Sequence, residues 1–133
     1  MDVNGIVALE LALGAVNADN FFDFARGTLL PNLLPFDGCN PRSVVIMDKC
    51  SIHHVHLIRE LFKDAGVLLL HLPPYSPDLN PLEEAFSKVK YYLKEHDTIM
   101  QCIPSPIPLI QAAFDSITES DCKGWVSHSG YGF

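Results

Sequence analysis

The stretch Leu72–Glu84, which reads Leu-Pro-Pro-Tyr-Ser-Pro-Asp-Leu-Asn-Pro-Leu-Glu-Glu, most constrains how this chain can fold. Its prolines fix φ and remove backbone donors, so the stretch predicts a rigid loop between two regular elements. A helix should begin at its end, because Asn80 is a good N-cap, Pro81 suits the first helical position and Glu83 follows three residues after the cap. The loop therefore carries the Glu83 carboxylate to a fixed place.

An apolar, β-branched run precedes this loop at Ser43–Asp48. It predicts a buried strand with an acid at its carboxyl end, where ligand sites of α/β sheets form. The next segment predicts a helix that starts at Ser51 or His53 and ends at Gly66. A second buried strand is expected at Val67–His71, so the two strands should be parallel with a right-handed crossover.

Residues before Ser43 predict a strand, a helix and a turn. The apolar run Gly5–Leu13 lies between glycines and favours a strand. Asn17 or Asp19 should cap a helix that ends near Leu30. The composition of Pro35–Arg42 is typical of a surface turn.

The helix after the loop should run from Pro81 to about His96. Its apolar residues fall on one stripe, made of Leu82, Phe86, Val89 and Leu93. At about 100° per residue, Glu83 lies roughly a quarter-turn from that stripe and Glu84 about opposite it. We therefore expect Glu83 to flank the buried side and Glu84 to face solvent.

The last part of the chain predicts a stiff linker followed by short helices. Prolines at positions 104, 106 and 108 form the linker, and one or two helices are expected within Leu109–Trp125. Thr118 is a plausible cap with Asp121 at the third helical position. The tail from Gly130 onward is expected to fray.

Two motifs together resemble one family. They are Val45–His53 (Val-Ile-Met-Asp-Lys-Cys-Ser-Ile-His) and Leu72–Glu83, with Phe86, Lys88 and Lys90 following in the helix. They are similar to the mariner-type DDE transposases, including bacterial insertion-sequence relatives. The resemblance implies an α/β, ribonuclease-H-like (DDE integrase/transposase) core, truncated at its N-terminus, over residues 1–100. A proline-rich linker and a C-terminal helical extension would fill residues 101–133.

The resemblance also implies a chemistry. Members of the family cleave DNA and transfer strands with two Mg²⁺ or Mn²⁺ ions held by carboxylates. The resemblance implies that Asp48 and Glu83 are the catalytic metal ligands here. Each has a plainer role open to it: Asp48 could be an ordinary strand-end acid, and Glu83 could form a capping box with Asn80. His53 matches a family histidine that could orient the strand-end loop, or it could simply bond the backbone at the helix start.

The chain departs from the family pattern twice. Lys49 replaces the usual asparagine, and its charge could pair with Asp48 and weaken cation binding. The first of the family's three acids has no good counterpart, because Asp2 is poorly placed in the strand order, so the chain is expected to start after it. The strand ending at Asp48 would then have an unpaired edge, to be filled by Gly5–Leu13, an upstream segment or a second copy in a homodimer.

Composition limits the functions further. The net charge of −7 argues against tight DNA binding by this chain alone. The widely spaced cysteines predict reduced thiols in an intracellular protein, nuclear in a eukaryote, and no apolar run is long enough to span a membrane. Three hypotheses remain. The first is a transposase-derived endonuclease core that is inactive alone and binds DNA, and the second is a non-enzymatic remnant that serves as a protein-interaction or DNA-associated module. The third, which the long motif disfavours, is an unrelated α/β domain with a capped proline loop. In the second, Asp48 and Glu83 are dispensable.

Overall fold

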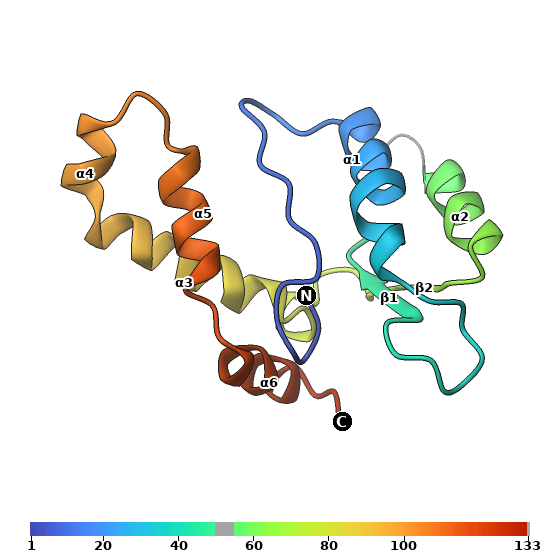
Figure 1. The fold of residues 1–133 in the computed structure, drawn as a ribbon. Helices are drawn as coiled ribbons and strands as arrows, with labels where there is room; N and C mark the ends of the chain where they lie inside the picture. Colours follow the sequence, from blue (N-terminus) through green and yellow to red (C-terminus); the bar gives the residue numbers. More distant parts are fainter. Residues whose placement is uncertain (50–54, 133) are drawn as a thin grey trace. The chain divides into compact units, whose positions relative to one another are not determined.

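The structure is a computed structural model, and it describes residues 1–49 and 55–132 of the chain (Figure 1). The chain forms two compact units. We call Val7–Ser76 the sheet unit, and Met1–Ile6 with Pro77–Phe133 the helical unit. The boundary between Ser76 and Pro77 falls inside the proline loop. The division expected after residue 100 stays a prediction.

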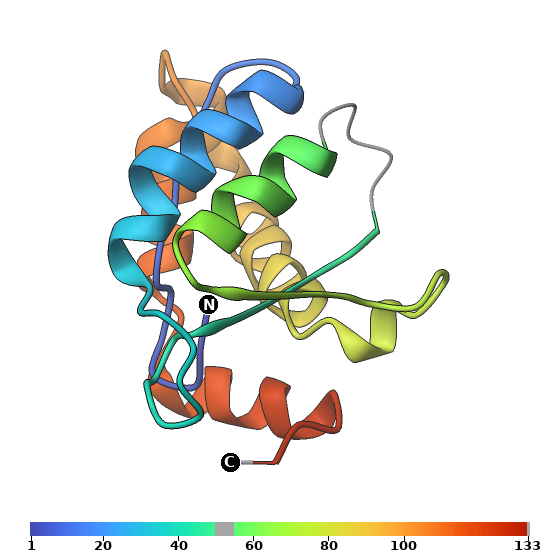
Figure 2. The ribbon, with the colours of Figure 1, turned by 90° about the vertical axis from the view of Figure 1, so that its right-hand side faces the viewer.

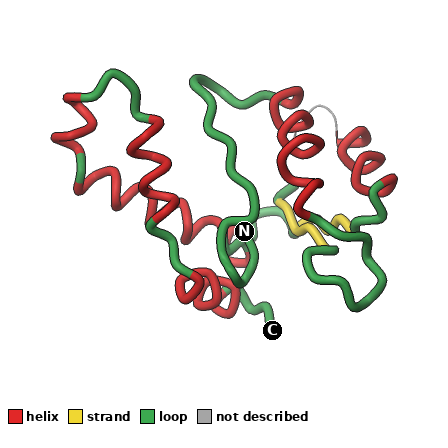
Figure 3. Tube along the Cα trace, viewed as in Figure 1, coloured by secondary structure: helices red, strands yellow, loops and turns green. Residues whose placement is uncertain are grey.

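The sheet unit contains two parallel strands (yellow in Figure 3). β1 (Val44–Met47) pairs with β2 (Leu68–His71), with Val44 opposite Leu68 and Met47 opposite His71. Helix α2 (Val55–Asp64) connects them. The predicted pair of parallel strands is confirmed, and in the described residues the fold is mixed α/β, mostly helical, with this small sheet.

The first helix of the sheet unit is α1 (Ala18–Phe24), and it starts where the sequence predicts. Asn17 and Asn20 form a reciprocal capping box: the Asn20 N–H donates to Asn17 Oδ1 at 2.9 Å and the Asn17 N–H donates to Asn20 Oδ1 at 3.1 Å. The chain continues through a π-helical segment, Ala25–Leu29, and a 3₁₀ turn, Leu30–Asn32. These segments extend the helix to its expected end.

The core of the sheet unit lies between the two helices and one face of the sheet, which α1 and α2 both cover (Figures 1 and 2). Ala25 and Phe62 are fully buried there. Partly buried side chains surround them, including Val45, Met47 and Leu69 of the inner sheet face. The opposite face stays exposed, and it consists of Val44, Ile46, Leu68 and Leu70. A strand that alternates in this way has one buried face only.

The predicted strand at Gly5–Leu13 is wrong. The described residues show there only an isolated antiparallel bridge between Asp2 and Gly5, followed by chain without regular secondary structure. Leu13 is 77% exposed, and the Glu10 carboxylate accepts a hydrogen bond from the Thr28 hydroxyl at 3.3 Å. An apolar run becomes a strand only where a neighbouring strand pairs with its backbone, and this segment is tied to the end of the first helix instead.

The helical unit contains a 3₁₀ turn, η3 (Pro77–Leu79), and four helices. They are α3 (Leu82–Glu95), α4 (Asp97–Cys102), α5 (Ile107–Asp115) and α6 (Glu119–His128). The predicted helix after the loop is confirmed, whereas part of the expected linker is helical. Pro106 and Pro108 sit at the cap and in the first turn of α5, where a missing N–H costs nothing. No helix in the described part of the chain is long and apolar enough to cross a bilayer.

Helix α3 packs with a face that is shifted slightly from the predicted stripe: Val89 is buried and Leu82 and Leu93 are partly buried as predicted, whereas Phe86 is more exposed. It contacts α5 and α6, and its buried residues are Ala85 and Val89, while Phe86 is 45% exposed. The small Ala85 side chain lets a neighbouring helix come close to α3. The buried side of α3 is therefore centred on Ala85 and Val89, and Leu82 lies at its border. Phe86 still meets Phe114 of α5 edge to face, with ring centroids 6.2 Å apart.

Helix α6 begins with the predicted capping box between Thr118 and Asp121. The Asp121 carboxylate accepts from the Thr118 N–H at 2.8 Å and pairs with the Lys88 ammonium of α3. These contacts, with Lys88 the strongest, lower the pKa of Asp121 from 3.8 to about 2.

That lowered pKa predicts a dependence of stability on pH. Because the folded pKa lies below the unfolded value, Asp121 stabilises the fold above pH 4, and this contribution disappears as the pH falls toward 2. We expect Asp121→Asn to lower the free energy of unfolding by about 1 kcal/mol at neutral pH. The difference between variant and parent should shrink toward zero by pH 2, as measured by urea unfolding across that range. A difference that stays constant with pH would contradict this role.

Candidate active-site carboxylates

Asp48 directly follows β1 and is exposed. The carboxyl ends of both strands meet here, because Met47 lies opposite His71 and the Leu72 N–H donates to the Met47 carbonyl at 2.9 Å. This is the edge at which the sequence predicts a ligand-binding carboxylate. Strand pairing therefore fixes the backbone that carries Asp48.

Of the two residues expected to support Asp48, the structure describes Lys49 but not His53. Lys49 follows Asp48 and is exposed. Because the two residues are adjacent, we expect the Lys49 ammonium to weaken cation binding at Asp48, and this effect stays a prediction. His53 lies outside the described residues, so its supporting role also stays a prediction.

The Asn80 side chain bonds the first turn of α3, although the N-cap position falls on Pro81, one residue later than predicted. Its side-chain Oδ1 accepts from the Leu82 N–H at 3.1 Å, and its carbonyl accepts from the Glu83 N–H at 3.1 Å. The backbone N–H of Asn80 donates to the Pro77 carbonyl at 3.0 Å. In a capping box that N–H would bond the Glu83 carboxylate. The 3₁₀ turn takes the donor instead, so the Glu83 carboxylate is not used to cap the helix.

The burial expected for the two adjacent acids of α3 is wrong. Glu83 is exposed, whereas Glu84 is half-buried and its Oε1 lies 2.8 Å from His128 Nδ1 of α6. Glu84 Oε2 is buried without a hydrogen-bond partner in the described residues. The prediction assumed that the Leu82–Phe86 stripe faces the core, but α6 covers the side of α3 that carries Glu84. Glu83 is therefore the carboxylate open to an external ligand.

Glu83 borders a pocket of about 560 Å³ in the helical unit. The 3₁₀ turn and the end of α6 line it, with Pro77–Asn80, Glu83, Glu84 and His128–Gly130. The tail was expected to fray, but it is bonded to the rest of the helical unit at Tyr131. The Tyr131 hydroxyl donates to the Leu79 carbonyl at 2.7 Å, and the Tyr131 N–H donates to the Val126 carbonyl at 3.1 Å. Gly130, at φ 88°, makes that return possible.

Asp48 and Glu83 carry the type of donor atom that a hard divalent cation prefers, namely carboxylate oxygen. Asp48 in the sheet unit and Glu83 in the helical unit each offer one exposed carboxylate, and such oxygen ligands suit Mg²⁺ and Mn²⁺. The described residues contain no group of three or more His, Cys, Asp or Glu side chains arranged to hold a metal. Asp48 and Glu83 belong to different units, and each is a single oxygen donor of the kind that such an ion binds.

The sequence comparison identifies the family. Residues 1–103, more than half of the chain, match the family described as DDE superfamily endonuclease. This chain belongs to the DDE superfamily of endonucleases. The match includes Asp48, Asn80 and Glu83. Neither the curated proteins nor the solved structures yielded a match.

Membership in the DDE superfamily carries general consequences. It implies a ribonuclease-H-like fold, and the parallel pair β1 and β2 with its connecting helix is the part of such a sheet present in the described residues. Endonucleases of this superfamily act on DNA and generally use divalent metal ions. Carboxylate oxygens, such as those that Asp48 and Glu83 expose, are the kind of ligand that divalent ions of this chemistry prefer.

Sequence reasoning missed two arrangements. One is the pair of Glu84 and His128, which no local pattern connects because 44 positions separate them. The other is a groove beside β2 that carries Arg59 and Lys63 of α2. The sequence contained a signal for the two cations of this groove, because basic residues four positions apart lie on the same side of a helix.

Proposed function

We propose that this chain is part of the catalytic core of a mariner-type DDE endonuclease, in which Asp48 and Glu83 bind Mg²⁺ or Mn²⁺ for DNA cleavage and strand transfer. The observation that carries the proposal is the family match over residues 1–103, a range that includes both acids. Both side chains are exposed, and each is held on a defined element. The mariner-type assignment rests on the motifs Val45–His53 and Leu72–Glu83.

The two carboxylates have distinct supports. Asp48 leaves the end of a hydrogen-bonded strand, and Glu83 leaves the first turn of a helix capped by Asn80. Metal ions held there would activate a water or a DNA 3′-hydroxyl and stabilise the leaving oxygen. The family uses three acids and this sequence offers two at motif positions. We therefore expect weak metal binding and no DNA cleavage by the chain alone.

A thermal melt of the chain with and without millimolar Mn²⁺ tests the proposal. A ligand that binds only the folded state raises the melting temperature, so Mn²⁺ should raise it in the parent chain. Asp48→Asn and Glu83→Gln together should remove this increase and lower the Mn²⁺ affinity, measured by calorimetry, by at least about tenfold.

The matched control removes the same amount of negative charge at a different place in the chain. Glu60→Gln with Asp64→Asn removes two exposed acids of α2 and should leave the Mn²⁺ response intact. If both double variants respond to Mn²⁺ like the parent, the ion is not held by Asp48 and Glu83. The chain would then be better described as a binding module derived from the endonuclease.

A further inference from the structure

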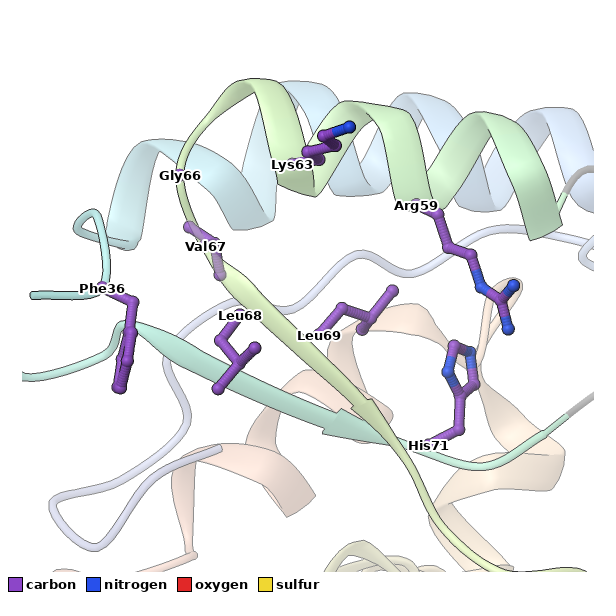
Figure 4. A pocket seen from close by; sticks show the side chains of 8 residues that line it. All are labelled: Phe36, Arg59, Lys63, Gly66, Val67, Leu68, Leu69 and His71. Carbon is purple, nitrogen blue, oxygen red and sulfur yellow. The ribbon is translucent and has the colours of Figure 1, made fainter. Parts of the chain in front are cut away.

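An open groove of about 520 Å³ runs along β2 in the sheet unit (Figure 4). Its floor is the apolar edge at the start of β2, where Val67 is buried, Leu69 belongs to the inner face of the sheet and Leu68 to the exposed face. Three kinds of side chain border this floor: Arg59 and Lys63 from α2, His71 at the end of β2, and Phe36 from the preceding turn. Figure 4 shows Arg59 extending from α2 toward His71.

The groove concentrates positive charge on an acidic protein. Arg59 and Lys63 are exposed and, in the described residues, neither forms a salt bridge. No acidic side chain lines the groove. The acids of the same helix, Glu60 and Asp64, lie about 100° further round it. With a net charge of −7 overall, this local excess of cations favours an anionic ligand.

Phe36 is fixed at one end of the groove. Its backbone N–H donates to the Gly66 carbonyl at 2.8 Å, and its side chain is 50% exposed. An exposed aromatic ring in a groove that also carries cationic side chains can serve as a platform for a nucleic-acid base. The ring is therefore held where a base could stack on it.

We infer that this groove binds single-stranded nucleic acid, with Arg59 and Lys63 contacting backbone phosphates and Phe36 stacking on an unpaired base. The inference rests on the proposed function in taking nucleic acid as the ligand. It goes beyond that function by assigning a binding surface separate from Asp48 and Glu83.

The lining favours an unpaired strand over a duplex. A duplex would place phosphates near Arg59 and Lys63 but would keep its bases stacked inside, away from Phe36 and the apolar floor. An unpaired strand can satisfy both parts of the groove at once. A peptide that adds to the open edge of β2 is the competing ligand, and it would not need the two cations.

Fluorescence anisotropy of the full chain with a labelled oligothymidine of about ten nucleotides tests the inference. Arg59→Gln with Lys63→Gln should reduce the slope of log K against log salt by about 1.4, because each phosphate contact on a single strand contributes about 0.7. Phe36→Leu, which keeps an apolar side chain, should weaken binding about tenfold while leaving the salt slope unchanged.

The charge-matched control is Lys90→Gln with Lys94→Gln, which removes two exposed cations of α3. It should retain most of the affinity and the salt slope. The groove assignment is overturned if this control weakens binding as much as the groove variant does. It is also overturned if duplex DNA binds at least as tightly as the single strand, or if binding ignores Arg59, Lys63 and Phe36.

The carboxylate variant separates this inference from the proposed function. Asp48→Asn with Glu83→Gln should bind the oligothymidine like the parent. If that variant loses the Mn²⁺ response while the groove variants bind the strand normally, the metal site stands and the groove fails. If the Mn²⁺ response is absent but the groove variants lose binding, the groove stands on its own.

Discussion

Phe62→Ala is expected to lower the free energy of unfolding by about 3–5 kcal/mol. Phe62 is fully buried in the sheet unit, where it packs with Ala25 of the first helix and Ile58 of its own helix. Alanine would lose most of that apolar contact and leave a cavity between the helices and the sheet. Small domains are stable by only about 5–15 kcal/mol, so this loss would remove much of the total.

Leu57→Ala is the matched control, because Leu57 lies on the same helix and is 37% exposed. It should cost less than about 1 kcal/mol. Urea unfolding followed by circular dichroism measures both values. If Phe62→Ala costs no more than Leu57→Ala, then Phe62 is not packed as the structure describes. The result also bears on function, because the core that Phe62 fills supports the strand that leads to Asp48.

Gly66→Ala is expected to cost about 2 kcal/mol. Gly66 follows α2 at φ 73°, and backbone bonds close the helix end: its N–H donates to Lys63 at 3.0 Å and the Val67 N–H donates to Phe62 at 2.9 Å. A side chain in this left-handed conformation costs about 1–2 kcal/mol. An added Cβ would also lie 3.2 Å from the Pro35 Cβ, so the turn before β1 would have to move.

Gly124→Ala provides a control of opposite sign. Gly124 lies inside α6, and a Cβ added there meets no atom within 4 Å. Alanine should therefore raise the free energy of unfolding by about 0.5–1 kcal/mol, because it restricts the unfolded chain and favours the helix. Thermal melts of the two variants should shift in opposite directions. Equal shifts would show that the conformation at Gly66 does not require glycine.

Many elements of this fold could be predicted because their signals are local. Asn17, Asn80 and Thr118 cap their helices through donors two or three residues away, and Gly66 ends a helix through its own φ. The apolar runs that became β1 and β2 are short and bounded by turns, and a helix between them requires parallel pairing. Nearby residues in the sequence are enough to specify each of these features.

The failed predictions all depended on distant partners. Gly5–Leu13 has the composition of a strand, but no strand pairs with it in the described residues, and Glu10 bonds Thr28 instead. The buried side of α3 is shifted from the predicted stripe toward Ala85, a small residue with a weak apolar signal, while Val89 is buried as predicted.

The sequence by itself determined the family and the order of most elements. These rest on contiguous motifs and on caps and turns whose energies come from residues a few positions apart. Only the tertiary structure decided that Glu84 pairs with His128 while Glu83 stays open to solvent, and that Arg59 and Lys63 share a groove with Phe36. Burial and charge pairing depend on which elements pack together, and such packing joins residues far apart in the chain.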